Sequence, residues 1–211
     1  MKIKAVFFDM GGVLLPLFPE KCMDAYRELA GFTDIEKYLD PCHQHGIFLD
    51  IEAGRMELDT FFSECLAHCR PGTTIETLYR CQEQFFGTPK QEDVALVKEL
   101  AQKYDVFMLS NNNAFSMQMH VPNFENAGLP LQTSFKKLFF SHEMKLLKPH
   151  PEIYLQAING SGYKAEECLF IDDSQRNVDG ALAVGMHAVL YRPGTESLRT
   201  LVYDTLSELN S

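Results

Sequence analysis

Residues 5–14 read Ala-Val-Phe-Phe-Asp-Met-Gly-Gly-Val-Leu, and this stretch decides how the chain is interpreted. Four apolar residues, typical of a strand buried on both faces, lead directly into Asp9 and a glycine-containing loop. A lone carboxylate at the end of a strand is a candidate nucleophile. Gly11 stands two residues later, where a second acid would be the natural partner for proton transfer. The stretch therefore predicts a reactive carboxylate that has no acid beside it.

Four further apolar runs have the same character, and the segments between them carry helical spacing and helix boundary residues. The runs span residues 106–109, 138–140, 168–171 and 187–191, and helices are expected over residues 89–104, 150–160, 174–184 and 197–209. This alternation predicts an α/β fold, a Rossmann-like parallel sheet sandwiched by helices. Ligands of such a sheet bind beyond the carboxyl ends of the strands, where Asp9, Ser110 and Asp172 would emerge.

Residues 16–87 interrupt the alternation. They show helical periodicity but no convincing buried strand, and residues 50–55 look like a helix end and turn. We expect a core domain made of residues 1–15 and 88–211, with residues 16–87 forming a helical cap inserted after the first strand. At the strand ends this cap would act as a lid over the site.

Composition limits the classes of partner. The chain has 19 basic and 29 acidic residues, a formal charge of −10, which argues against a nucleic-acid or anionic-membrane surface. An anionic substrate must therefore be held by local groups or a metal ion. No apolar stretch approaches the roughly 20 residues of a membrane span, and the start does not resemble a signal peptide. A cytoplasmic protein is the simplest expectation.

The six cysteines are expected to be reduced in such a protein. An alternative is a zinc site assembled from two segments, residues 42–45 and 65–69, which contain both cysteine and histidine. The spacing fits no closed zinc module, and buried thiols are common. Structural cysteines are therefore the favoured interpretation.

Two adjacent acids, Asp172 and Asp173, follow the apolar run at residues 168–171. Adjacent carboxylates repel each other unless a cation or hydrogen-bond donors intervene, and oxygen ligands favour Mg²⁺. Taken alone, the pair could equally be a helix cap and turn. Together with Asp9 and a backbone carbonyl of its loop, it would form half of a magnesium coordination shell.

Two other segments carry groups suited to an anion. Residues 110–113 read Ser-Asn-Asn-Asn and offer hydroxyl, amide and backbone donors, although asparagine runs are also ordinary loop material. Lys148 precedes Pro149 and a helix start, where its ammonium could face Asp9 and a bound phosphate. The alternative for Lys148 is a solvated side chain, as for most lysines.

The order of these motifs resembles the haloacid dehalogenase (HAD) superfamily. In chain order they read Phe7-Phe8-Asp9-Met10-Gly11-Gly12-Val13-Leu14, Leu109-Ser110-Asn111, Leu147-Lys148-Pro149-His150-Pro151-Glu152-Ile153-Tyr154 and Phe170-Ile171-Asp172-Asp173-Ser174. The resemblance covers residues 6–191. Within the superfamily, the chain is similar to the branch of bacterial sugar-phosphate phosphatases such as the α-glucose-1-phosphate phosphatases.

The resemblance implies a metal site. Asp9 would ligate Mg²⁺ and would also attack phosphorus to give an aspartyl-phosphate. The Gly11 carbonyl and Asp173 would be further ligands, with Asp172 in a supporting position.

The resemblance also implies a phosphate site. Ser110 and Asn111 would hold the phosphate, and Lys148 would offset charge between it and Asp9. These roles agree with what phosphoryl transfer requires, namely alignment and charge neutralisation.

Gly11 departs from the superfamily pattern, because most of its phosphatases have an aspartate there that protonates the leaving group. Such help contributes roughly 10²–10⁴ in rate. Gly11 therefore predicts a slower enzyme, one limited to easier leaving groups, or one whose acid comes from the lid. His43, His45 and Glu52 are titratable residues of the lid, and the sequence does not rank them.

The leading hypothesis is a Mg²⁺-dependent phosphatase acting on a small phosphorylated metabolite such as a sugar phosphate. One alternative is a catalytically weak or inactive phosphate-binding protein, which Gly11 favours. The other is a metal-free 2-haloacid dehalogenase. Dehalogenases of the superfamily also lack the acid at the Gly11 position, but typically have Ser-Ser-Asn where this chain has Asp172-Asp173-Ser174.

Overall fold

A five-stranded parallel sheet lies at the centre of the computed structural model, which describes residues 2–39 and 44–211. The strands are β1 (Ala5–Phe8), β2 (Asp105–Ser110), β3 (Lys137–Phe140), β4 (Cys168–Asp172) and β5 (His187–Leu190). They lie in the order β3-β2-β1-β4-β5. Each falls on one of the apolar runs, so the predicted α/β fold with a Rossmann-like parallel sheet is confirmed.

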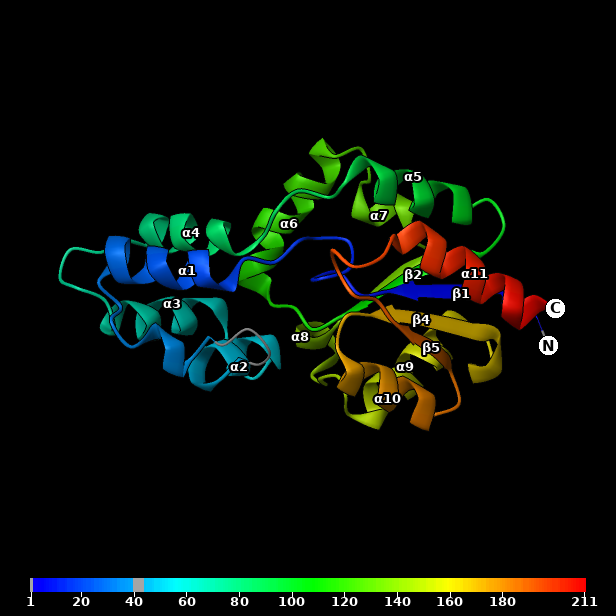
Figure 1. Ribbon diagram of the computed structural model, residues 1–211. Helices are drawn as coiled ribbons and strands as arrows, with labels where there is room; N and C mark the ends of the chain where they lie inside the picture. Colours follow the sequence, from blue (N-terminus) through cyan, green and yellow to red (C-terminus); the bar gives the residue numbers. More distant parts are fainter. Residues whose placement is uncertain (1, 40–43) are drawn as a thin grey trace.

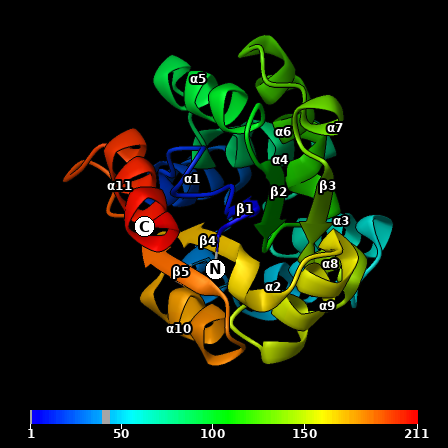
Figure 2. The same cartoon turned by 90° about the vertical axis from the view of Figure 1, so that its right-hand side faces the viewer.

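Helices cover both faces of this sheet (Figures 1 and 2). They are α5 (Gln91–Leu100), α6 (Ala114–Asn126), α7 (Leu131–Ser134), α8 (Ser141–Met144), α9 (Pro151–Ser161), the 3₁₀ turn η4 (Ala165–Glu167), α10 (Gln175–Ala183) and α11 (Leu198–Asn210). The predicted helix over residues 89–104 is shorter than expected, because Lys90 is extended and residues 101–103 form turns that lead into β2.

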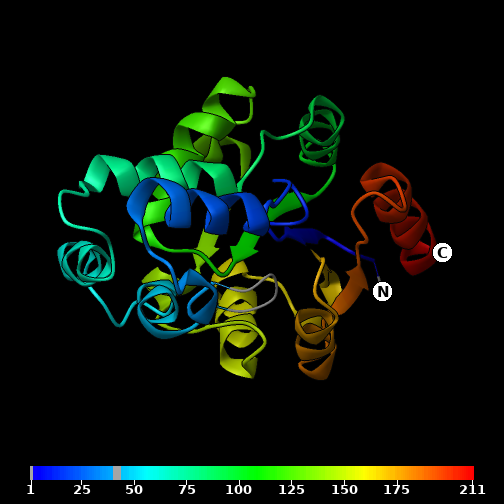
Figure 3. The same cartoon turned by 60° about the vertical axis from the view of Figure 1, so that its left-hand side comes forward.

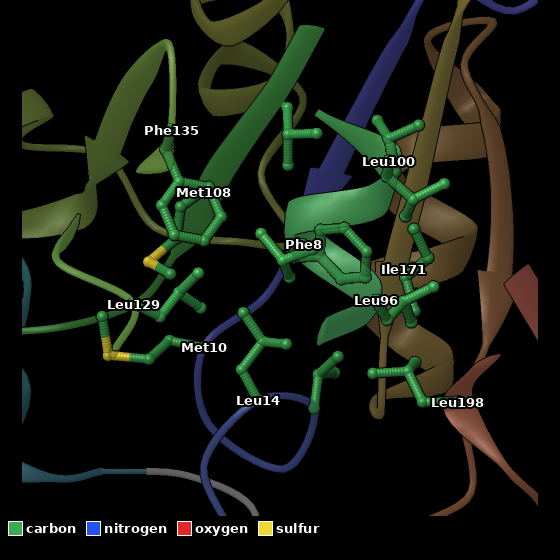
Figure 4. Close-up of a cluster of buried hydrophobic side chains, with 14 of the residues drawn as sticks. Phe8, Met10, Leu14, Leu96, Leu100, Met108, Leu129, Phe135, Ile171 and Leu198 are labelled. Carbon is green, nitrogen blue, oxygen red and sulfur yellow. The ribbon is translucent and has the colours of Figure 1, made fainter. Parts of the chain in front are cut away.

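Strand side chains alternate between two apolar layers, as the pleat of a sheet requires. Val6 and Phe8 join the cluster beneath α5 and α11, part of which is drawn in Figure 4. Ala5 and Phe7 join the opposite cluster, formed with α9 and α10. Burial of strands on both faces explains why the sequence showed continuous apolar runs rather than alternation.

The helices within residues 19–39 and 44–85 form a separate group beyond the carboxyl ends of the strands (Figures 1 and 3). They are α1 (Pro19–Ala25), the π-helical turn η1 (Tyr26–Ala30), the 3₁₀ turn η2 (Ile35–Lys37), α2 (Gly46–Glu52), α3 (Leu58–Ala67), α4 (Ile75–Gln82) and the 3₁₀ turn η3 (Glu83–Phe85). They pack around their own apolar cluster, which Phe115 of α6 also joins.

The two connections between this group and the sheet run side by side. The Phe18 N–H donates to the Phe85 carbonyl at 2.7 Å, and the Gly87 N–H donates to the Pro16 carbonyl at 2.8 Å. The helical insert therefore leaves and returns to the core at a single place.

The cysteines Cys22, Cys65, Cys69, Cys81 and Cys168 are free thiols, and Cys42 lies outside the described residues. No helix within residues 2–39 and 44–211 is both long and apolar enough to cross a membrane.

Replacement of Phe7 by alanine tests the importance of the layer beneath α9. Phe7 is fully buried, and its ring stacks on that of Phe107 with centroids 4.7 Å apart. We expect Phe7→Ala to lower the free energy of unfolding by about 3–5 kcal/mol, the usual effect of a cavity at a buried phenylalanine. Urea denaturation measures it. Leu155→Ala, at a side chain that is 51% exposed on α9, should change stability by less than about 0.5 kcal/mol. Equal effects of the two substitutions would contradict the packing described.

Candidate active site

Three carboxylates meet at the centre of the sheet. β1 and β4 are neighbours, and their register pairs Phe8 with Ile171, so the residues that follow each strand lie close together. One carboxylate oxygen from each of Asp9, Asp172 and Asp173 lies within 4.8 Å of the others. The sheet order changes direction between β1 and β4, which is where ligands bind in open α/β sheets.

A buried ammonium holds two of these carboxylates. Lys148, 4% exposed, places its Nζ 2.9 Å from Asp9 Oδ1 and 2.6 Å from Asp172 Oδ2. Burial alone would lower the pKa of Lys148, but the attraction of Asp172 and Asp9 raises it above its ordinary value. Lys148 is therefore a charged part of the cluster and not the solvated side chain of the alternative interpretation.

Asp172 has its oxygens occupied within the protein. Besides Lys148, it accepts hydrogen bonds from the Ser174 N–H at 2.8 Å and from Asn177 Nδ2 at 3.0 and 3.2 Å. Asp172 is also fully buried, whereas Asp173 is exposed toward the cavity described below. These contacts suit Asp172 to a supporting position and Asp173 to contact with a ligand.

The carboxylates destabilise one another in their charged form. Burial raises the pKa of Asp9 to about 7, with Lys148 acting in the opposite direction and Asp172 and Asp173 raising it further. Burial and the neighbouring Asp172 raise the pKa of Asp173 to about 6. A cation bound between Asp9 and Asp173 would relieve this repulsion, and an all-oxygen donor set fits Mg²⁺.

The loop after β1 allows the close approach of Asp173. Gly12 has a φ of +71°, and a Cβ atom at this position would lie 1.8 Å from Asp173 Oδ2. Any side chain there would displace the carboxylate. Gly11 lacks such crowding, since a Cβ atom would meet only the tip of Leu17 at 3.3 Å, and its predicted role as a carbonyl ligand stays a prediction.

Ser110 and Asn111 lie at the end of β2, beside Asp9. A hydrogen bond from the buried Ser110 lowers the pKa of Asp9, in the same direction as Lys148. The Asn111 side chain accepts from the Lys148 N–H at 2.9 Å and donates to the Lys148 carbonyl at 3.1 Å. Its amide therefore positions the lysine, which the sequence did not indicate; the predicted phosphate contacts of both residues stay predictions.

A cavity of about 540 Å³ opens in front of these groups. Asp9, Gly11, Ser110, Lys148 and Asp173 line one side of it. The helical insert lines the other side, through the residues Leu17, Leu39, Gln44, Phe48, Leu49, Glu52, Gln82, Phe85 and Phe86. The predicted site residues and the insert thus enclose one space.

The structure separates the titratable insert residues that the sequence could not rank. Glu52 lines the cavity; His45 is exposed and is not among the residues that line it; His43 lies outside the described residues. His120 of α6 also lines the cavity, and burial lowers its pKa to about 3. His120 was not predicted from the sequence, because no local motif marks which face of α6 turns toward the site.

The zinc alternative gains no support. Within residues 2–39 and 44–211, the three aspartates are the only group of three or more potential ligands close enough to share a metal ion. Cys65 and Cys69 belong to no such group, and Cys42 and His43 lie outside the described residues.

Comparison with known proteins agrees with the geometry. The family model described as a haloacid dehalogenase-like hydrolase matches residues 3–185. A D-ribitol-5-phosphate phosphatase from Bacteroides thetaiotaomicron is 33% identical over 177 residues, 83% of this chain and 85% of the relative.

Two solved structures are similar over nearly the whole chain. One is a HAD-family enzyme from B. thetaiotaomicron, a single-aspartate mutant in complex with magnesium and inorganic phosphate; its TM-score is 0.89 at 28% identity, covering 95% of this chain and 98% of the other. The second is a predicted HAD-like family hydrolase from Porphyromonas gingivalis, with a TM-score of 0.88 at 32% identity and 98% coverage of both chains.

Substitution of Gly12 tests whether its close approach to Asp173 serves the predicted magnesium site. We expect Gly12→Ala to lose most of the Mg²⁺-induced rise in melting temperature, because the new Cβ atom displaces Asp173. Gly72→Ala is the matched control: its φ of +88° imposes similar strain, about 1–2 kcal/mol, but no atom lies within 4 Å. Thermal unfolding with and without Mg²⁺ measures both. An unchanged Mg²⁺ response in Gly12→Ala would contradict the site described.

Proposed function

The chain belongs to the haloacid dehalogenase-like hydrolase family, and from this we propose that it is a Mg²⁺-dependent phosphatase acting on a small polyhydroxylated metabolite, a sugar or sugar-alcohol phosphate. The observation that carries the proposal is the cluster of Asp9, Asp172 and Asp173 around the buried Lys148, facing a cavity of metabolite size. The relative from B. thetaiotaomicron, named a phosphatase, supports the same reaction class.

The metal site of the proposal consists of Asp9, Asp173 and the Gly11 carbonyl, with Asp172 in support. Mg²⁺ bound there would neutralise charge on the carboxylates and on the phosphate oxygens. The three carboxylates lie close enough to need such a cation, which supports this assignment.

In the proposed reaction, a carboxylate oxygen of Asp9 attacks phosphorus and the bond from phosphorus to the leaving oxygen breaks. The product is an aspartyl-phosphate on Asp9, which water then hydrolyses to inorganic phosphate. Lys148 offsets charge between Asp9 and the phosphate, and Ser110 with Asn111 holds the phosphate oxygens. Positioning and charge neutralisation of this kind account for most of the rate of phosphoryl transfer.

The substrate class is argued from the insert side of the cavity. Gln44 Oε1 is buried, has no hydrogen-bond partner among the described residues, and belongs to a side chain that lines the cavity. An acceptor of this kind suits the hydroxyl donors of a polyol. The relative named a D-ribitol-5-phosphate phosphatase supports a pentitol phosphate as one member of the class.

We propose residues 16–87 as the cap domain that provides this specificity. The paired connections at residues 16–18 and 85–87 would be the hinge between cap and core.

Two other interpretations of Gly11 receive less support. A metal-free dehalogenase would have to admit an anionic haloacid beside the acidic pair Asp172-Asp173 without a cation. A protein that only binds phosphate would not need Asp9, Lys148 and Asp173 held in one reactive arrangement.

Replacement of the nucleophile tests the reaction. We expect the wild-type protein to release p-nitrophenol from p-nitrophenyl phosphate with Mg²⁺ present, and Asp9→Asn to lower the rate by about 10³-fold or more. EDTA should abolish the wild-type rate, and Mg²⁺ should restore it. Asp24→Asn, at an exposed residue of α1, should be unaffected. Persistent turnover in Asp9→Asn, or wild-type turnover in EDTA, would contradict the proposal.

A comparison of two alkyl phosphates tests the substrate class. We expect kcat/KM for D-ribitol 5-phosphate to exceed that for n-butyl phosphate, which has no hydroxyl groups, by about tenfold or more; that factor corresponds to about 1.4 kcal/mol, or roughly one hydrogen bond. Gln44→Ala should reduce this preference, since it removes an acceptor that lines the cavity. Equal kcat/KM values for the two esters would contradict recognition of hydroxyl groups.

A further inference from the structure

We propose that Glu52, at the end of α2, is the general acid and base of this site and supplies from the insert the proton that Gly11 cannot. The inference rests on the proposed phosphatase function. It arises from the cavity, which Glu52 shares with Asp9 and Gly11 although 43 residues separate Glu52 from Asp9 in the sequence.

Within the part of the chain that the structure describes, few groups that line the cavity can exchange a proton with a leaving group. The titratable ones are Asp9, Glu52, His120, Lys148, Asp173 and Arg176. Lys148 keeps its proton because Asp172 and Asp9 hold it, and Asp9 and Asp173 are assigned to nucleophile and metal. Burial keeps His120 neutral at physiological pH. Glu52 is the remaining candidate, since arginine does not lose its proton in proteins.

The position of Glu52 is fixed by contacts with the core rather than by the hinge. The Ser141 hydroxyl donates to the Glu52 carbonyl at 2.7 Å, and the Ser141 hydroxyl oxygen also accepts from the Asn112 N–H at 2.9 Å. Asn112 belongs to the loop that follows Ser110. One buried hydroxyl therefore joins the end of α2 to the loop proposed to hold the phosphate.

A close backbone approach holds the same segment. Gly54 has a φ of +64°, and a Cβ atom there would lie 2.1 Å from the carbonyl oxygen of His142 in α8. Because α8 directly follows the carboxyl end of β3, the end of α2 contacts the same end of the sheet from which the reactive groups emerge. The side chain of Glu52 thus enters the cavity from a rigid support, as a catalytic group requires.

The environment of Glu52 suits a proton donor that works near neutral pH. Burial raises its pKa to about 7, and the positive charge of Lys148 acts against this rise. The other charged groups that line the cavity, Asp9, Asp173 and Arg176, include both signs. A carboxyl group with a pKa near the working pH is present in both forms, which acid–base catalysis needs.

The surroundings of Gly11 explain why the proton would come from the insert. The side chain of Leu17 lies beside Gly11, with a methyl carbon 3.3 Å from where a Cβ atom would be. This neighbour is apolar and has no proton to donate, whereas Glu52 carries a carboxyl group and lines the same cavity.

In the proposed reaction, Glu52 gives up a proton in the first step and regains one in the second. As Asp9 attacks phosphorus and the ester bond breaks, the proton of the Glu52 carboxyl moves to the departing oxygen and gives the free alcohol. In the second step, the Glu52 carboxylate takes a proton from water as the water oxygen attacks phosphorus. The bond between Asp9 and phosphorus breaks, and inorganic phosphate and protonated Glu52 result.

Comparison of leaving groups tests the role of Glu52. The alkoxide of n-butyl phosphate needs a proton, whereas the p-nitrophenolate of p-nitrophenyl phosphate leaves readily without one. We expect Glu52→Gln to lower kcat for n-butyl phosphate by about 10²–10⁴-fold and kcat for p-nitrophenyl phosphate by less than about tenfold. The wild-type kcat for n-butyl phosphate should fall above about pH 7, and this fall should be absent in Glu52→Gln. Glu57→Gln, an exposed residue that precedes α3, is the matched control and should behave as wild type.

Other outcomes would overturn the proposal. Equal loss for both esters would mean a structural role for Glu52. A rise in KM for D-ribitol 5-phosphate, with no selective loss of kcat for n-butyl phosphate, would mean hydroxyl binding. Absence of Mg²⁺-dependent turnover of both esters in the wild-type protein would instead defeat the proposed phosphatase function itself. If Glu52→Gln does not fold, Glu52→Asp should show the same selective loss, because its carboxyl group is withdrawn by one methylene.

Restoring an acid at the family position gives an independent check. Gly11 has no positive φ and its missing side chain would meet only the end of Leu17, so an aspartate can be placed there. We expect the double variant Gly11→Asp, Glu52→Gln to recover at least about tenfold of the lost n-butyl phosphate rate. A double variant as slow as Glu52→Gln alone would show that the missing group is not a proton donor.

Discussion

The contact between the Lys148 ammonium and the carboxylates of Asp9 and Asp172 organises the site. With all groups ionised, three carboxylates and one ammonium leave two negative charges in a largely buried cluster. The single ammonium lies 2.6 Å from Asp172 and 2.9 Å from Asp9, so it cannot offset all three carboxylates. A divalent cation bound between Asp9 and Asp173 would supply the missing charge, and the oxygen donor set suits Mg²⁺.

Neighbouring side chains and a glycine hold this contact in place. Asn111 binds both the N–H and the carbonyl of Lys148, and Asn177 binds both oxygens of Asp172. Gly12 leaves room for Asp173 where any other residue would collide with it. These groups come from the segments that end or follow β1, β2, β3 and β4, so the parallel sheet brings distant parts of the chain together.

The sequence could predict those parts of the site that lie at strand ends. Strands buried on both faces produce continuous apolar runs, and their ends mark Asp9, Ser110 and Asp172 without further information. The start of α9 was visible because Pro151 suits a first helical turn. The ranking of His45 against Glu52 was not visible, since it depends on the contact between Glu52 and Ser141, which lie 89 residues apart. The use of the Asn111 amide to hold Lys148 likewise depends on tertiary packing.

A proton donor on the insert depends on contacts between the insert and the core. An aspartate at the Gly11 position would instead share a short loop with Asp9, and that loop alone would set the distance between the two groups. The proposed acid Glu52 is held by the hydrogen bond of its carbonyl with the Ser141 hydroxyl, which also binds the loop after β2. In the proposed reaction, protonation of a departing alkoxide depends directly on this contact. Under this proposal, the insert both recognises the leaving group and protonates it, so substrates can be distinguished by their leaving groups.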